Sequence, residues 1–103
     1  MSSRLEKLQA MLDADPADTM VRYMLAMECD KADEHDRSLT LFEGLMQDTP
    51  PYVPAFLMAG QLLVRLGRVD EARGVYQSGI AQARQQGNDH AAGEMSQFLD
   101  ELN

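Results

Sequence analysis

The sequence has little cysteine, few basic residues and no long apolar run, and each of these absences excludes something. With a single cysteine among 103 residues, no disulfide can form within the chain, which fits a reducing compartment. Nine Lys and Arg against 17 Asp and Glu leave a net charge of −8. This charge argues against broad binding to nucleic acid or to anionic membranes, both of which favour a basic face. No apolar run reaches the length that spans a bilayer.

The beginning of the chain, MSSRLEKLQAM, lacks the apolar core of a signal peptide. We therefore expect a soluble, cytoplasmic protein. The apolar fraction of 45% and the charged fraction of 25% are those of an ordinary globular protein. A chain of this length buries roughly two-thirds of its unfolded surface, so residues 1–103 are expected to form one domain.

The sequence also lacks a recognisable catalytic or metal site. The run from Glu28 to Asp36 holds five carboxylates, His35 and Cys29, but it has neither the order of a calcium loop nor the paired Cys or His spacing of a zinc site. Asp33, Glu34 and Asp36 are sufficiently explained as helix caps, and Cys29 as a buried side chain. His35 and His90 belong to no catalytic triad. We expect no enzymatic activity, no cofactor and no metal.

Proline and glycine instead divide a helical pattern into six segments, with no sustained alternation of period two. Ser3 with Glu6 resembles a capping box at the first helix, and Asp18 and Asn88 suit the N-caps of later helices. Short loops between the segments predict antiparallel helical hairpins, hence an all-α fold. The first helix is expected from Ser3 to just before Pro16, and the others over about 18–31, 34–47, 53–66, 69–86 and 88–102.

The order of small, bulky and turn residues recurs after 34 positions. Residues 22–50 align with residues 56–84 without a gap. Two helices cross closely only where a side chain is small, so the small positions predict close contacts and the bulky ones fill the space beside them. Such a hairpin needs a stacked neighbour to bury its apolar side. The aligned pairs are Ala26/Gly60, Cys29/Leu63, Asp33/Gly67, Ser38/Ala72, Phe42/Tyr76 and Met46/Ile80.

On these residues the chain resembles the tetratricopeptide repeat family. The second unit carries the resemblance most strongly, in Gly60, the string LGRVDEA at 66–72 and Tyr76. The first unit differs, since Asp33 replaces the usual glycine and Ser38 the usual alanine. The resemblance covers about residues 3–86 and implies a short right-handed superhelix with a concave groove. It implies a half repeat at 3–16, repeats at 18–50 and 52–86, and a C-terminal capping helix at 88–102.

In this family the first helix of each repeat lines the groove, which implies a methionine-rich surface here. Methionine is flexible and suits varied apolar ligands, so a partner helix or an extended peptide is expected. The family's carboxylate clamp of lysine, arginine and asparagine is missing, which argues against binding a chaperone tail. Lys31 and Arg65 are either anchors for an acidic group or helix-end cations. The expected groove residues are Met20, Tyr23, Met24, Met27, Lys31, Leu57, Met58, Gln61, Val64 and Arg65.

Other interpretations of the same residues remain open. A methionine stripe at helical spacing is usually core, and the first or sixth helix would fill the groove by folding across it. The groove would also serve homodimerisation, which makes the chain a self-associating structural unit. A secretion-type chaperone is a narrower form of the interaction module, supported here only by charge and fold.

Overall fold

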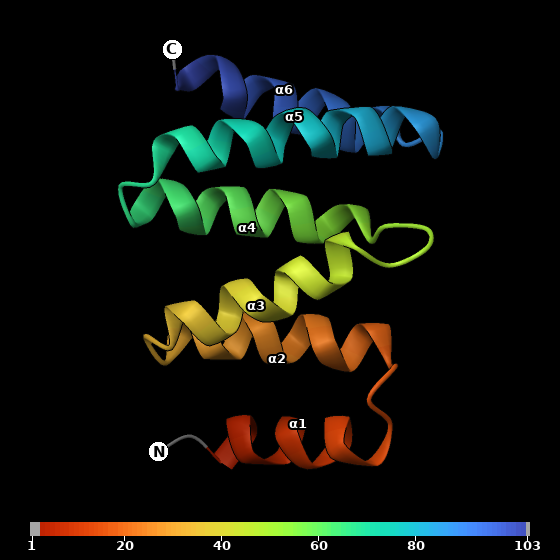
Figure 1. The fold of residues 1–103 in the computed structure, drawn as a ribbon, viewed down its shortest axis with the longest axis vertical. Coiled ribbons are helices and arrows are strands. Elements are labelled where there is room, and N and C mark those ends of the chain that lie inside the picture. Colours follow the sequence, from red (N-terminus) through yellow and green to blue (C-terminus); the bar gives the residue numbers. More distant parts are fainter. Residues whose placement is uncertain (1–2, 103) are drawn as a thin grey trace.

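The computed structural model describes residues 3–102, which form six helices (Figure 1). No strand occurs within this part of the chain, so the predicted all-α fold is confirmed. Every predicted helix is present, with bounds within two residues of the expected ones. The helices are α1 (Ser3–Ala14), α2 (Thr19–Lys31), α3 (His35–Met46), α4 (Val53–Arg65), α5 (Val69–Gln85) and α6 (Asp89–Glu101).

The helices stack in chain order from α1 at one end to α6 at the other (Figure 1). α2 pairs with α3 and α4 with α5 as antiparallel hairpins, and α3 packs against α4 to join them. α1 packs on α2, and α6 packs along α5 and also touches α4. The stack measures 38 × 29 × 18 Å. Its thinnest dimension is about two helix diameters, as expected for hairpins stacked side by side.

Side-chain caps start two of the helices as predicted. A carboxylate oxygen of Asp18 accepts a hydrogen bond from the Val21 amide at 3.0 Å, and the Asn88 side chain accepts one from the Ala91 amide at 3.1 Å. Ser3 is already part of α1, so it does not occupy the N-cap position that the predicted capping box with Glu6 requires. Glu34 occupies the N-cap position of α3 without capping it.

Three helices end in the same left-handed turn. Asp33, Gly67 and Gly87 have φ values of 61°, 76° and 75°. In each turn the amide of the next residue donates back to a carbonyl five positions earlier, for example Arg68 to Leu63 at 2.9 Å, which satisfies the helix end. Asp33 thus adopts the conformation that its alignment with Gly67 predicts.

The predicted close contacts between paired helices are present. Ala26, Ser38 and Ala72 are fully buried, and the Ser38 hydroxyl donates to the Ala26 carbonyl at 2.6 Å. At Gly60, an added Cβ would lie 2.3 Å from a ring carbon of Tyr76, so only glycine admits the ring. Small residues therefore set the helix spacing in both hairpins.

The buried apolar residues form two clusters. The larger runs from α2 through α6 and contains Phe42, Phe56 and Tyr76. The smaller joins α1 to α2 through Leu5, Leu8, Leu25 and Cys29, with Met24 packed against it. The core therefore continues through the whole stack, as it does in repeat proteins.

Candidate functional site

The predicted groove residues of α2 lie on one side of that helix, at spacings of three and four. Met20 is 53% exposed, and Tyr23 and Met27 are half-buried against the larger core cluster. Met24 is half-buried too, but it packs against the cluster shared with α1. An apolar strip thus runs along α2, and α1 supports it at Met24.

The predicted residues of α4 form the neighbouring strip. Leu57, Met58 and Val64 pack on the larger core cluster and remain partly exposed. Gln61 is half-buried and Arg65 is exposed at the end of α4. We call the two strips together the inner face, which is made of the ten groove positions expected from the sequence.

A pocket of about 350 Å³ lies between the end of α4 and α6. It takes up Gln61, Val64 and Arg65 from the inner face and adds four residues that sequence reasoning did not assign to a site. Two of them, Tyr76 and Phe98, stack with their ring centroids 6.1 Å apart. We call it the α4–α6 pocket; its added residues are Tyr76, Phe98, Glu101 and Leu102.

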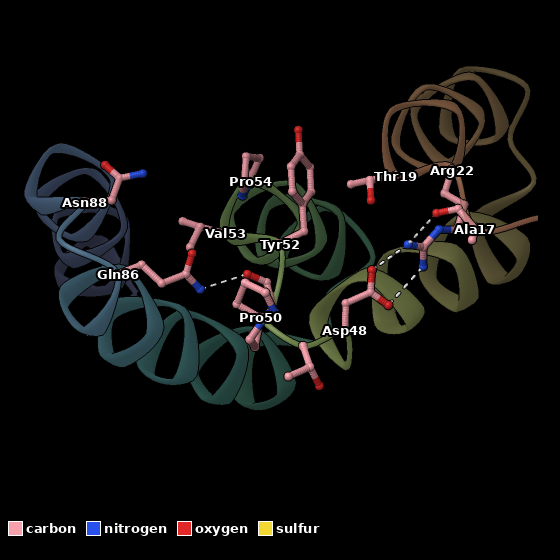
Figure 2. A pocket seen from close by; sticks show the side chains of 12 residues that line it. Ala17, Thr19, Arg22, Asp48, Pro50, Tyr52, Val53, Pro54, Gln86 and Asn88 are labelled. Atoms are coloured by element: carbon pink, nitrogen blue, oxygen red, sulfur yellow. Dashed lines mark hydrogen bonds and ion pairs between the residues drawn. The ribbon is translucent and has the colours of Figure 1, made fainter.

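A larger pocket of about 680 Å³ lies where α2, α4 and α6 begin (Figure 2). Thr19, Tyr52 and Asn88 line it from the starts of these three helices, and Pro54 lies beside Tyr52. The Tyr52 ring also meets Tyr23 of the inner face edge-on, with centroids 5.3 Å apart. The two pockets therefore lie at opposite ends of α4.

Two contacts hold the loops around the larger pocket, and both are drawn in Figure 2. The Arg22 guanidinium binds both carboxylate oxygens of Asp48, at 3.1 and 2.5 Å. Hydrogen bonding from Arg22 lowers the pKa of Asp48 below its usual value. The Gln86 amide donates to the Pro51 carbonyl at 2.9 Å and ties the end of α5 to the α3–α4 loop.

The two cations expected as either anchors or helix-end charges, Lys31 and Arg65, each lie near a carboxylate. Arg65 binds both carboxylate oxygens of Asp30, at 3.3 and 2.6 Å, and so links α4 to α2. Lys31 is 73% exposed, with its ammonium 4.0 Å from a Glu28 oxygen. Arg65 therefore joins the two hairpins and is not available as an open anchor for an acidic group.

The acidic run at 28–36 is accounted for by ion pairs and turns. His35 Nδ1 lies 3.3 Å from an Asp30 oxygen, and Glu34 pairs with Arg37 at 3.1 Å, which corrects the expectation that its side chain caps α3. Within residues 3–102 no group of three or more His, Cys, Asp or Glu is placed to hold a metal ion. Cys29 is fully buried as predicted, and burial raises the pKa of its thiol.

Two helices were predicted to be able to fill the groove, and each lies against part of the inner face. α6 packs on α5, where the Met95 sulfur lies 2.6 Å from the position of a Cβ on Gly79. α1 packs on α2 and covers the side of Met24. Neither helix covers Met20, which is 53% exposed.

The site residues that sequence reasoning missed are on α5, on α6 and before α4. Phe98 and Leu102 belong to the C-terminal helix, which was expected to cap the last repeat. Tyr52 stands between Pro51 and α4, where a lone aromatic residue carries only a weak signal. The spacing of Phe98 and Leu102 by four residues was the clue available, because it extends an apolar strip to the end of α6.

None of the helices within residues 3–102 is both long enough and apolar enough to cross a membrane. No curated protein matches the chain. Residues 31–94 match the family model described as tetratricopeptide repeat.

Solved structures resemble the chain over most of its length. A solution structure of a tetratricopeptide repeat domain protein from Salinibacter ruber is 37% identical, with 86% of this chain and 90% of that one covered and a TM-score of 0.80. A crystal structure of such a protein from the same organism is 36% identical, with 82% and 94% covered and a TM-score of 0.74. A protein from Bordetella parapertussis is 26% identical, with 99% and 89% covered and a TM-score of 0.81. The chain therefore belongs to the tetratricopeptide repeat family.

Proposed function

We propose that the inner face binds a segment of a partner protein. Tetratricopeptide repeats generally mediate protein–protein interactions. The observation that carries the proposal for this chain is the exposure of Met20, 53%, beside half-buried apolar side chains of both α2 and α4. A contiguous apolar patch on a protein surface is commonly an interaction site, whereas a single exposed apolar residue is not, so the proposal depends on Met20 together with its half-buried neighbours.

Binding would be driven by removing this apolar surface from water, at about 25 cal/mol per Å². Methionine side chains adjust their shape at little cost, so Met20, Met27 and Met58 suit an apolar anchor whose shape is not fixed in advance. α4 has 13 residues. That gives it a length of about 20 Å. A partner segment of about six extended residues would reach from one pocket to the other.

The test uses peptides selected from a displayed random library for binding to the intact chain. Met20→Glu is expected to weaken the selected peptides by about tenfold or more, because a carboxylate would have to be buried under the apolar anchor. Met20 is exposed, so the variant should keep the helical circular dichroism and the unfolding midpoint of the parent. Met24 is unsuitable for this test, since it packs against α1.

Ser78→Glu is the matched control, because it adds the same charge at an exposed position of α5 on another side of the molecule. It should leave peptide affinity unchanged. Equal affinity of both variants would contradict the proposal. The proposal would also be contradicted if the parent chain sediments as a dimer and Met20→Glu sediments as a monomer. The inner face would then bind a second copy of the chain.

Removing α6 would not separate an open groove from a filled one. α6 buries Ala92 and Met95 against the second hairpin, so its loss would expose core residues of either arrangement. Point substitutions on exposed positions therefore give the sharper test.

A further inference from the structure

The α4–α6 pocket has a carboxylate on its rim, that of Glu101, whereas the ten residues of the inner face include no acidic side chain. Its floor is apolar and aromatic, made by Val64, Tyr76, Phe98 and Leu102. Its charged rim consists of Arg65 from α4 and Glu101 from α6. Which of these two charges is available decides what the pocket attracts.

The positive charges near this pocket are already paired. Arg65 holds both oxygens of Asp30. Arg73 lies 2.5 Å from Asp70 and donates to the Leu102 carbonyl at 2.9 Å, so it completes the end of α6. Neither of these two arginines would bind an anion without giving up a carboxylate.

The negative charges of α6 are not matched in this way. The helix contains Asp89, Glu94, Asp100 and Glu101 but no lysine or arginine. Within residues 3–102 none of these four carboxylates has an ion pair. The Glu101 charge reaches the pocket floor, because it adds to burial in raising the pKa of Tyr76.

Helix geometry places a second carboxylate near Phe98. Glu94 precedes Phe98 by four residues and Glu101 follows it by three, so all three lie on one side of α6. Glu94 and Glu101 are exposed and Phe98 is half-buried. An apolar group seated on Phe98 would therefore have a carboxylate on either side of it.

We propose that the α4–α6 pocket holds an apolar side chain of a basic partner segment, with a lysine or arginine of that segment beside Glu101. The proposal deepens the proposed function and rests on it. Aromatic rings attract a cation over their faces, and a long basic side chain packs its stem on apolar surface while its charge stays in water. The net charge of −8 favours the approach of such a segment over that of an acidic one.

The test uses three small probes with the same ring, namely phenethylammonium, 2-phenylethanol and 3-phenylpropionate. Each is titrated into the intact chain while the methyl signals of Val64 and Leu102 are followed by NMR. Phenethylammonium is expected to bind about fivefold more tightly than 3-phenylpropionate, with 2-phenylethanol between them, because exposed charge pairs are individually weak. Raising the salt concentration should reduce this difference.

Glu101→Gln should remove most of the preference for the cation and leave the affinity for 2-phenylethanol unchanged. Glu43→Gln is the control, because Glu43 is exposed on α3 and its substitution changes the net charge equally. Equal effects of the two variants would overturn the proposal, as would tighter binding of the anion.

The remaining outcomes also decide the question. Probes that leave Val64 and Leu102 unshifted, while selected peptides still depend on Met20, would overturn the pocket assignment and leave the proposed function standing. Methyl shifts at Val64 and Leu102 that grow with protein concentration in the absence of any probe would assign the pocket to a second copy of the chain.

Discussion

The two hairpins, α2–α3 and α4–α5, have one geometry built from different side chains. In the first, Ser38 packs on Ala26 and its hydroxyl donates to the carbonyl there. In the second, Ala72 is buried and glycine at position 60 leaves room for the Tyr76 ring. The comparison shows that the repeat specifies how closely the helices approach, and that several combinations of residues satisfy it.

A second pair of positions exchanges volume between the hairpins. In the second hairpin Phe56 packs on Gly79, with the Phe56 Cβ 2.6 Å from where a Cβ on that glycine would lie. The positions 34 residues earlier hold Arg22 and Leu45, and Leu45 is fully buried. Arg22 binds Asp48 beyond the end of α3. In the second hairpin the large residue, Phe56, comes from the first helix and the small one, Gly79, from the second. In the first hairpin the buried large residue, Leu45, comes from the second helix, and Arg22 of the first helix forms an ion pair instead.

The largest expected effect comes from filling the space at Gly60. Gly60→Ala should lower the free energy of unfolding by about 2–3 kcal/mol, because the new methyl group overlaps the buried Tyr76 ring. Urea unfolding measures it. Gly74→Ala is the matched control, since no atom lies within 4 Å of its added Cβ, and it should raise the free energy by about 0.5–1 kcal/mol. Equal changes at both positions would show that packing at Gly60 is not tight.

The next effect compares the left-handed turns. Gly67→Asp should lower the free energy of unfolding by about 1–2 kcal/mol, since a side chain disfavours φ near 76°. Asp33→Gly should raise it by about 0.5–1 kcal/mol for the same reason. The lost contact between Asp33 and His35, 3.7 Å with Asp33 89% exposed, should cost little. Thermal unfolding measures both variants. If the two substitutions change the stability in the same direction, the two turns are not equivalent.

A smaller effect tests the hydrogen bond that only the first hairpin has. Ser38→Ala, which installs the residue of the second hairpin, should lower the free energy of unfolding by about 1 kcal/mol. The Ala26 carbonyl lies inside α2 and keeps its helical partner, so no buried acceptor is left unpaired. Denaturant unfolding of this variant beside Ala72→Ser measures it. A loss several times larger would mean that the hydroxyl also holds the helices apart.

The smallest effect concerns Asp48 and depends on pH. Hydrogen bonding to Arg22 lowers the folded-state pKa of Asp48, so the stabilisation is present above the unfolded value of about 3.9 and is lost as pH falls through the folded value. Asp48→Asn should therefore be less stable than the parent at neutral pH, and the difference should shrink below about pH 4. Unfolding curves across this range measure it, with Glu43→Gln as the control. A difference independent of pH would contradict the assignment.

The fold was predictable because the starts and ends of its helices depend on short stretches of sequence that recur in the repeat. Asp18 and Asn88 start helices, and Asp33 and Gly67 end them, through backbone geometry that short stretches of sequence reveal. The site was less predictable, because it depends on contacts between distant elements. Neither the pairing of Arg65 with Asp30 nor the position of Phe98 beside Val64 follows from the spacing of residues along one helix.

The central claim is that the inner face is where a partner segment binds, and the methionines test it directly. With their methyl groups labelled by ¹³C, a peptide selected against the intact chain should shift Met20, Met27 and Met58. Met46, which lines an apolar pocket with Val75 on another side of the stack, and the fully buried Met95 should stay in place. Shifts at Met46 with Met20 and Met58 unchanged would contradict the account.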